Sequence, residues 1–310
     1  MHGPEATETF ACFGGRASVI VMGDGPAGTA AAAAALTRRR LLEWHNQFSR
    51  FEEASELTRL NADPRRTVEV SAVMARLVSA ILDAARCSGG LVDGTLVGEL
   101  ERAGYLRHFD GEPVALELAL RLAPARAAAR PSVRARWSEV QVDRAAGTVT
   151  RPPGLRFDSG GIAKGLFGDI LAGILGGHAS FALDCAGDVR LGGSAGLARP
   201  VEVASPFDNS ILHVFEVVDG AAATSGIGRR SWLDAAGRPA HHLLDPASAR
   251  PAFTGLVQVT ALAPTAVEAE VLAKTGLLRG PAGVAATLRH GGLAVHDSGR
   301  TEVIAAAGPR

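Results

Sequence analysis

Residues 157–169 read Phe-Asp-Ser-Gly-Gly-Ile-Ala-Lys-Gly-Leu-Phe-Gly-Asp, and they combine polar residues, paired glycines and the start of an apolar pattern. A short apolar run at 155–157 leads into it and predicts a strand. From Ile162 onward apolar residues recur at helical spacing until Gly176, so the pattern is strand, glycine turn and helix. Amides at a helix N-terminus carry partial positive charge, and Lys164 in the first turn adds a full charge. The stretch therefore indicates a phosphate site or, equally, an ordinary helix start with a solvent-exposed lysine.

The composition places the chain among globular proteins. Its 310 residues are 47% apolar, which is enough for a large core, and the formal net charge is zero. Charges of both signs are interspersed, which argues against a nucleic-acid partner. No apolar stretch resembles a membrane span or a leader, so a cytoplasmic protein without a membrane partner is expected. Cys12, Cys87 and Cys185 lack metal-ligand spacing and are expected to be reduced, buried thiols.

Residues 23–28, Gly-Asp-Gly-Pro-Ala-Gly, match the glycine fingerprint of dinucleotide-binding folds. They follow a predicted strand at 17–22. A Rossmann fold also needs a second strand that ends in an acidic residue about 20 positions further on. Residues 29–48 instead predict one long helix, so a hairpin or loop is favoured over a dinucleotide site.

Polar loops separate the remaining elements. A short helix capped by Ser55 and an amphipathic helix over 71–87 lead to a glycine-rich loop at 88–95. Asp93 in this loop either belongs to a turn after the helix or binds a ligand. Residues 221–232 predict a loop with hydroxyls, glycines and paired arginines, and arginine suits phosphate because its planar fork donates two bonds at once.

Together these separated signatures resemble one family, the ApbE-type flavin transferases, which move FMN from FAD onto a hydroxyl of a partner protein. The resemblance covers nearly the whole chain. It rests on residues 49–61, 90–95, 158–165 with Asp169, 186–188, 224–226 with Arg229, 242–246 and 263–274.

The resemblance implies a role for each matching position. Contacts with FAD are implied for Phe13, Phe51, Leu91, Val92, Asp93, Asp158, Gly160, Lys164, Ser225, Gly226 and Leu244. His242 would be the base, a role that suits the intrinsic pKa of imidazole, with Lys164 and Arg229 as further catalytic residues at the phosphates. A Mg²⁺ ion would be bound by the backbone carbonyl of Gly161 and by the side chains at positions 270 and 274.

The chain departs from the family at three positions. Met is usual where Phe13 stands, and Asp and Thr are usual where Glu270 and Lys274 stand. An ammonium group cannot ligate a cation, so the usual metal site cannot be intact. As i and i+4 neighbours on a predicted helix, Glu270 and Lys274 would form an ion pair worth about 0.3–0.5 kcal/mol. Alternatively, Lys274 takes over part of the metal's charge at the diphosphate, while Glu270 orients it or holds a weaker Mg²⁺.

The predicted fold is α/β (α+β): a single two-lobed domain over residues 1–310, ApbE-like or T-fold-like, with mixed β-sheets flanked by helices. A lobe boundary is expected near 124–131, with the ligand between the lobes. The predicted activity transfers FMN from FAD through a phosphoester bond to a Ser or Thr hydroxyl of a partner flavoprotein subunit and releases AMP. The alternatives are a homologue that only binds or hydrolyses FAD, and a Rossmann-type flavin or nicotinamide oxidoreductase that uses Gly23 to Gly28.

Overall fold

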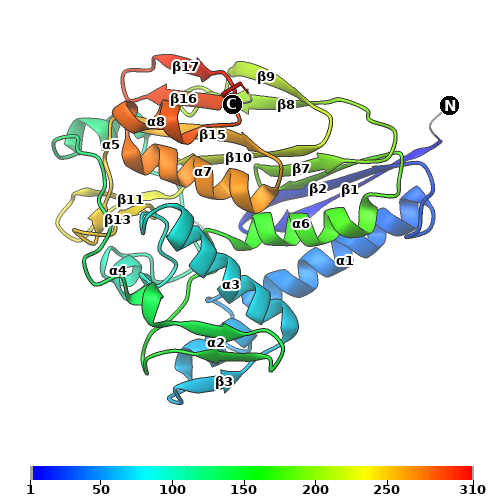
Figure 1. The fold of residues 1–310 in the computed structure, drawn as a ribbon. Coiled ribbons are helices and arrows are strands. Elements are labelled where there is room, and N and C mark those ends of the chain that lie inside the picture. Colours follow the sequence, from blue (N-terminus) through cyan, green and yellow to red (C-terminus); the bar gives the residue numbers. More distant parts are fainter. Residues whose placement is uncertain (1–2, 110, 309–310) are drawn as a thin grey trace.

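An antiparallel sheet is the largest element of the computed structural model, which describes residues 3–109 and 111–308 (Figure 1). Its eight strands lie in the order β1-β2-β6-β7-β10-β15-β16-β17. Their bounds are β1 Glu5–Cys12, β2 Gly15–Met22, β6 Ser180–Cys185, β7 Asp188–Gly192, β10 Gly220–Gly226, β15 Leu256–Ala263, β16 Gly292–His296 and β17 Thr301–Ile304. Every neighbouring pair of these strands is antiparallel. With the helices described next, the sheet confirms the predicted α+β class.

Three long helices cover one face of this sheet (Figure 1). They are α1 Ala30–Phe48, α6 Ala163–Leu175 and α7 Ala266–Arg279. α1 contacts β1 and β2, α6 contacts β6 and β7, and α7 contacts β10 and β15. Thr29 and Thr265 cap α1 and α7, because their hydroxyl oxygens accept hydrogen bonds from the amides of Ala32 and Glu268. α1 and α6 confirm the helices that the sequence predicts over 29–48 and from Ile162 onward.

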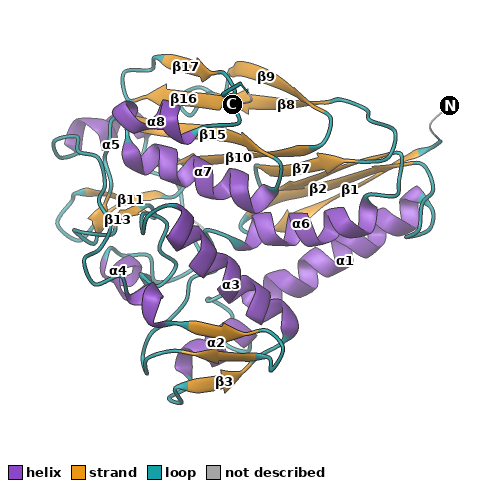
Figure 2. Ribbon diagram, in the orientation of Figure 1, coloured by secondary structure: helices purple, strands orange, loops and turns teal. Residues whose placement is uncertain are grey.

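A smaller unit packs below α1 and α6 in the view of Figure 2. It contains α2 Glu56–Ala62, α3 Ala72–Cys87, the 3₁₀ helix η1 Arg136–Glu139, and a three-stranded sheet of β3 Thr67–Glu69, β4 Gln141–Asp143 and β5 Thr148–Thr150. Leu41 of α1, Leu77 of α3 and Phe167 of α6 belong to one buried cluster. The small unit therefore shares a hydrophobic core with the helices that cover the main sheet.

The other face of the main sheet is partly covered by a hairpin of β8 Arg199–Ala204 and β9 Ile211–Val217. The remaining elements are α4 Val97–Arg102, α5 Leu116–Leu122, β11 Ser231–Leu233, β12 Pro239–His241, β13 Leu244–Asp245, β14 Arg250–Pro251 and α8 Pro281–Thr287. Within residues 3–109 and 111–308, none of the helices combines the length and the apolar character that crossing a membrane requires.

The glycine fingerprint at 23–28 forms the turn between β2 and α1. The backbone amides of Gly25 and Gly28 each donate to the other residue's carbonyl, at 3.0 and 2.9 Å. The strands on either side of β2 are β1 and β6, and both run antiparallel to it, whereas a dinucleotide fold requires a parallel β-α-β unit. The loop prediction is confirmed, and the Rossmann-type alternative is wrong.

Three local predictions from the sequence are wrong. Residues 155–157 form no strand, because the side-chain amide of Asn61 takes the hydrogen bonds of Phe157 that a neighbouring strand would have made. The first part of the loop expected at 221–232 is the central strand β10. Its alanines are buried, Ala221 and Ala223 on the face that α7 covers and Ala222 on the opposite face. Cys87, at the end of α3, is exposed rather than buried.

The starts of α6 and α7 are joined by two side-chain carboxylates. Asp169 of α6 accepts hydrogen bonds from the amides of Ala266 and Val267, at 2.8 and 3.0 Å. Glu270 of α7 accepts one from the amide of Gly165, at 3.1 Å. Each carboxylate thus lies at the positive end of the neighbouring helix, where a negative charge is stabilised. This exchange requires the two backbones to approach closely.

Replacing Gly165 with Ala is expected to lower the free energy of unfolding by about 1–3 kcal/mol, because the site is overpacked. An added Cβ would lie 2.7 Å from the carbonyl oxygen of Ala266 and 2.8 Å from the nitrogen of Val267, and neither backbone atom can rotate away. Gly173 on the same helix is the matched control, since nothing lies within 4 Å of its added Cβ. Gly173→Ala is expected to raise stability by about 0.5–1 kcal/mol. Urea unfolding measures both changes, and similar values for the two variants would contradict the close helix contact.

Candidate active site

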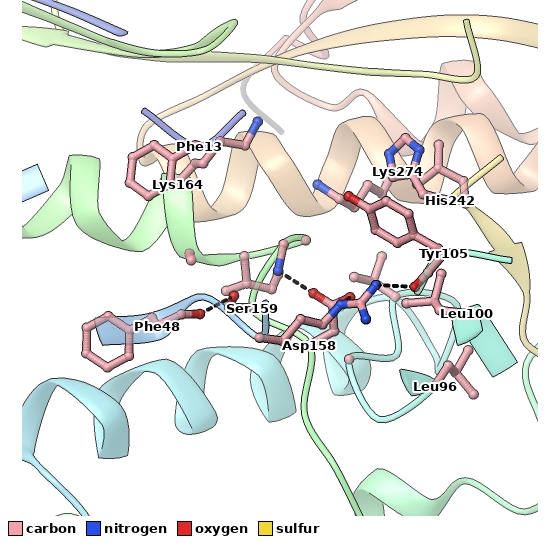
Figure 3. Close-up of a pocket in the computed structure, with 18 of the residues that line it drawn as sticks. Phe13, Phe48, Leu96, Leu100, Tyr105, Asp158, Ser159, Lys164, His242 and Lys274 are labelled. Atoms are coloured by element: carbon pink, nitrogen blue, oxygen red, sulfur yellow. Dashed lines mark hydrogen bonds and ion pairs between the residues drawn. The ribbon is translucent and has the colours of Figure 1, made fainter. Parts of the chain in front are cut away.

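A cavity lies at the start of α6, between the main sheet's helices and the loops near α4 (Figure 3). Its apolar wall includes aromatic side chains from several elements. The described residues that line it are Phe13, Trp44, His45, Phe48, Ser49, Arg50, Phe51, Leu91, Val92, Asp93, Gly94, Leu96, Leu100, Tyr105, His108, Asp158, Ser159, Gly160, Gly161, Ile162, Ala163, Lys164, Phe167, Arg230, His242, Leu243, Leu244, Lys274 and Leu278. An apolar cavity with a few convergent polar groups is typical of a small-molecule site.

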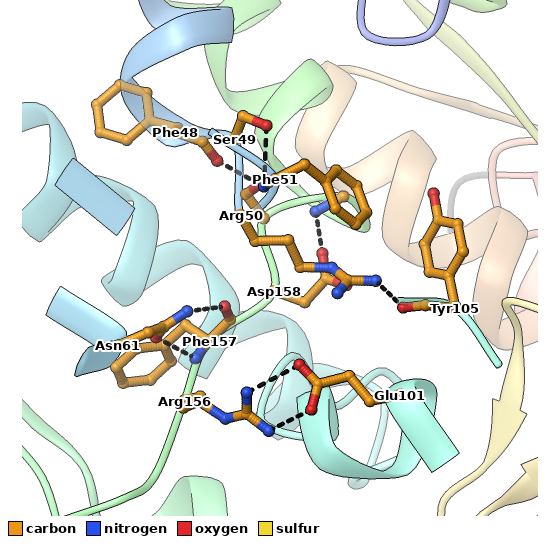
Figure 4. Close-up of polar contacts among 12 residues, drawn as sticks. Phe48, Ser49, Arg50, Phe51, Asn61, Glu101, Tyr105, Arg156, Phe157 and Asp158 are labelled. Atoms are coloured by element: carbon orange, nitrogen blue, oxygen red, sulfur yellow. Dashed lines mark hydrogen bonds and ion pairs between the residues drawn. The ribbon is translucent and has the colours of Figure 1, made fainter. Parts of the chain in front are cut away.

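The segment before α6 is held in place by hydrogen bonds to three distant parts of the chain. The side-chain nitrogen of Asn61 donates to the carbonyl of Phe157 at 2.9 Å, and the side-chain oxygen of Asn61 accepts from the backbone amide of Phe157 at 2.7 Å (Figure 4). The amide of Asp158 donates to the carbonyl of Gly94, and the hydroxyl of Ser159 donates to the carbonyl of Phe48. These bonds fix the irregular backbone from which α6 begins.

Asp158 and Arg50 form an ion pair in the cavity wall, 3.3 Å from carboxylate oxygen to Nε. The other oxygen of Asp158 accepts from the amide of Gly160 at 2.6 Å. The guanidinium of Arg50 donates to the carbonyl of Tyr105 and lies 4.2 and 4.7 Å from the ring centroids of Phe51 and Tyr105 (Figure 4). Arg50 therefore positions the glycine turn and two aromatic rings at once.

Two buried ion pairs bring lysines to the cavity. The ammonium of Lys164 lies 2.5 Å from the carboxylate of Asp188 on β7, and that of Lys274 lies 3.0 Å from Glu270 one helical turn away. The side chains of the lysines are 15% and 12% exposed, and those of the carboxylates 3% and 1%. Burial opposes the charge on Lys164, but the carboxylates of Asp188 and Glu270 outweigh it and raise the pKa of the ammonium.

The residues at the implied metal position do not fit a divalent cation. Both oxygens of Glu270 are engaged, one by the ammonium of Lys274 and the other by the amide of Gly165. Lys274 packs against Gly161, since a Cβ on that glycine would lie 3.4 Å from Cε of the lysine. The part of the chain that the structure describes holds no group of three or more His, Cys, Asp or Glu side chains that could bind a metal. The Glu270–Lys274 pair is buried, so it is not the surface ion pair that helix spacing alone would suggest.

His242 and Arg230 both line the cavity. Burial holds the pKa of the His242 imidazole well below its usual value. The positive charge of Arg230 lowers it further, and His241 and Lys274 have smaller effects. Its Nδ1 is buried, and no hydrogen-bond partner for it lies among the described residues. The imidazole is therefore neutral near pH 7 and can accept a proton.

The structure brings together most of the predicted site residues. Those that line the cavity are Phe13, Phe51, Leu91, Val92, Asp93, Asp158, Gly160, Gly161, Lys164, His242, Leu244 and Lys274. Glu270 lies directly behind Lys274. Arg229, Ser225 and Gly226 do not belong to the lining: Arg229 is exposed, and the other two lie within β10.

The predictions from the sequence did not include several residues that line or support the cavity. Arg230 lines the cavity in place of its neighbour Arg229, and Arg50, Tyr105 and Asp188 support or line the site. Arg50 and Asp188 stand inside segments that carried the family resemblance, so that signal could have found them. Tyr105 follows a charged helix and has no comparable signal in the sequence.

Comparison with known proteins identifies similar chains. The sequence model of the ApbE family matches residues 13–296. A FAD:protein FMN transferase of Escherichia coli (strain K12) is 30% identical over 150 residues, which is 46% of this chain and 42% of that protein. The match therefore spans less than half of that relative's length. A FAD:protein FMN transferase of Vibrio cholerae is 28% identical over 77% of this chain and 71% of its own.

Solved structures with the same fold include the ApbE protein of Thermotoga maritima. The match covers 97% of this chain and 97% of that chain, with a TM-score of 0.78 and 23% sequence identity. The flavinyl transferase ApbE of Pseudomonas stutzeri, in its apo form, covers 98% of this chain and 96% of its own with a TM-score of 0.75 and 20% identity. These likenesses confirm the predicted fold.

Replacing Arg50 with Met is expected to lower the free energy of unfolding by about 3–5 kcal/mol, because it leaves the carboxylate of Asp158 buried without its partner. Arg156→Met is the matched control. Arg156 forms two hydrogen bonds with Glu101, at 2.8 and 2.6 Å, but both side chains are about one-third exposed (Figure 4). Its loss should cost about 0.2–1 kcal/mol. Denaturant unfolding measures the stability of both variants. An equal loss of unfolding free energy in the two would show that burial of the Arg50–Asp158 pair does not increase its contribution.

The acid stability of the protein is expected to depend on His241, which lies behind the cavity edge-to-face against Phe253. Burial lowers the pKa of His241 to about 3, whereas it is about 6.5 in an unfolded chain. The contribution of the neutral imidazole is present above pH 6.5 and is lost as the pH falls toward 3. Between pH 7 and pH 5 the wild type should lose about 2 kcal/mol more than His241→Phe does. Unfolding curves at both pH values test this, and parallel losses would refute it.

Proposed function

The chain belongs to the ApbE family, and from this we propose that it transfers FMN from FAD to a hydroxyl group of a partner protein. The observation that carries the proposal is that one cavity joins Lys164, Lys274 and His242 with Phe51 and Asp158. These residues come from segments far apart in the sequence. A cavity with an aromatic wall and a cationic end suits a ligand that has flat rings linked by a diphosphate.

FAD would place its rings against the apolar wall and its diphosphate near the start of α6. The N-cap residue, Ile162, has no polar side chain to cap the helix, and the first turn of α6 lines the cavity with Ala163 and Lys164. The amide of Gly165 in this turn is already bound by Glu270. Lys164 in the first turn and Arg230 across the cavity add positive charge. Positioning and charge neutralisation are what phosphoryl transfer asks of a protein.

In the proposed reaction the hydroxyl oxygen of a Ser or Thr on the acceptor attacks the phosphorus that bears the riboflavin. The new oxygen–phosphorus bond joins FMN to the acceptor, and the bond from that phosphorus to the bridging oxygen breaks. The bridging oxygen leaves with AMP, and His242 takes the hydroxyl proton. Lys164, Lys274 and Arg230 stabilise the charge on the phosphate oxygens. We assign this role to Arg230 rather than to Arg229, because Arg230 lines the cavity and Arg229 is exposed.

The depressed pKa of His242 fits the base role in the ligand-free state only in part. A neutral imidazole is ready to accept a proton, but a low pKa makes it a weak base. The nearby cations Arg230 and Lys274 contribute to the low value. Bound diphosphate would offset their charge and raise the basicity of His242 at the moment when the base is needed. Substrate binding and base strength are thereby coupled.

Lys164→Met is expected to lower the rate of FMN transfer by about 10²–10³-fold, because one preorganised cation at the phosphates is lost. His242→Ala should lower it by about 10²–10⁴-fold through loss of the base. Arg86→Met is the control: it removes one positive charge from an exposed ion pair with Asp83 on α3, and neither residue lines the cavity. The assay incubates each protein with FAD and a candidate acceptor and follows the FMN adduct by mass spectrometry.

The release of AMP in the same reaction separates transfer from hydrolysis. Equal amounts of AMP and FMN adduct support transfer, whereas AMP without an adduct, with free FMN in its place, would support the hydrolysing alternative. Full activity in both Lys164→Met and His242→Ala would remove the proposed mechanism.

A further inference from the structure

The two lysines of this chain stand out from its other basic residues. Of the 32 lysines and arginines, 30 are arginines, and the two exceptions are Lys164 and Lys274. Both line the same cavity. A lysine ammonium is a compact, strongly hydrated point charge, whereas an arginine guanidinium is a broad planar fork. The chain thus carries its compact cations only in this cavity.

Lys274 is held rigidly at this position. The carboxylate of Glu270, 1% exposed, accepts from the ammonium of Lys274 with one oxygen and from the amide of Gly165 with the other. The aliphatic part of the lysine packs against Gly161, whose missing Cβ leaves room for it. The ammonium is therefore fixed beside the glycine turn and the start of α6, and little side-chain entropy is lost when a ligand binds.

The lining of the cavity carries a positive excess without a metal ion. Its charged side chains are Arg50, Lys164, Arg230 and Lys274 against Asp93 and Asp158. Burial raises the pKa of Asp93. Asp188 and Glu270 lie behind the ammonium groups, so a ligand in the cavity meets the cations first. This order of charges suits a diphosphate diester, which carries one negative charge on each phosphate.

We propose that the two ammonium groups of Lys164 and Lys274 bind the diphosphate of the dinucleotide, and that this chain needs no divalent cation for binding or transfer. The inference rests on the proposed function and names the groups that neutralise its substrate. Lys274 supplies a permanent charge in place of an exchangeable ion. Glu270 is a positioning residue, because it lies behind that ammonium and orients it without contacting the dinucleotide itself.

The first test measures FAD affinity by flavin fluorescence, with EDTA or with Mg²⁺. We expect the same dissociation constant in both. Lys274→Met should weaken binding about ten- to hundredfold in either condition, because a hydrogen bond to a charged group is lost. The double variant Glu270→Gln/Lys274→Met removes the pair without leaving a buried unpaired carboxylate, and it should show the same loss. Arg86→Met is the charge control and should bind as the wild type does.

A second readout observes the lysines directly. Protein that contains isotope-labelled lysine gives an NMR signal for each of the two side chains, and FAD added in EDTA should shift both. Riboflavin has the same ring system but no phosphate, so it should leave both signals near their original positions. Mg²⁺ added afterwards should change neither. A lysine signal that FAD does not move would overturn the assignment of that ammonium.

The outcomes separate this inference from the proposed function. Transfer that stops in EDTA and returns with Mg²⁺ would overturn the inference and leave the transferase function standing. FAD binding that is independent of Mg²⁺ and dependent on Lys274, without an FMN adduct on any acceptor, would support the inference and count against the function. A failure to bind FAD in either condition would overturn both.

Discussion

The exchange of carboxylates between α6 and α7 is the interaction on which the site depends. Asp169 caps the start of α7, and Glu270 reaches back to the amide of Gly165 at the start of α6. Each bond places a negative charge at the positive end of a helix, and together they fix how the two helices meet. Because Lys164 lies on one helix and Lys274 on the other, the same contact sets the distance between the two ammonium groups. The Glu270 carboxylate therefore has both a structural role and an electrostatic role.

A second constraint comes from the irregular backbone before α6. Asn61 replaces the hydrogen bonds of a missing strand neighbour, and Asp158 ties the glycine turn to Arg50. Irregular backbone is costly to bury unless its polar groups are paired, and here side chains from distant segments pair them. The small unit with α2 and α3 thus supplies the support for the cavity. It shares the buried cluster of Phe167, so the site and the core are one structure.

The helices were predictable because their signals are local. Ser55, Ser71 and Thr265 cap the helices that follow them, as the sequence indicated, and Thr29 caps the long helix expected over 29–48. Strand β10 was not predictable, because its small residues look like a loop and are stabilised only by α7 and by two neighbouring strands. Strand formation depends on partners that are distant in the chain, so propensity alone misassigned it.

The amino-acid sequence alone identified the family, the long helices, and a set of site residues most of which line the cavity, because motifs and apolar periodicity are local properties. It also placed two lysines at positions that resemble a phosphate site and a metal site. The folded chain was needed to show which of two adjacent arginines lines the cavity and that Asp188 is the partner of Lys164. These features depend on the direction of side chains in the segment after β10 and on the contact between α6 and β7. Burial then makes the Glu270–Lys274 pair a fixed charge in the site, because low exposure removes the solvent screening that a surface pair would have.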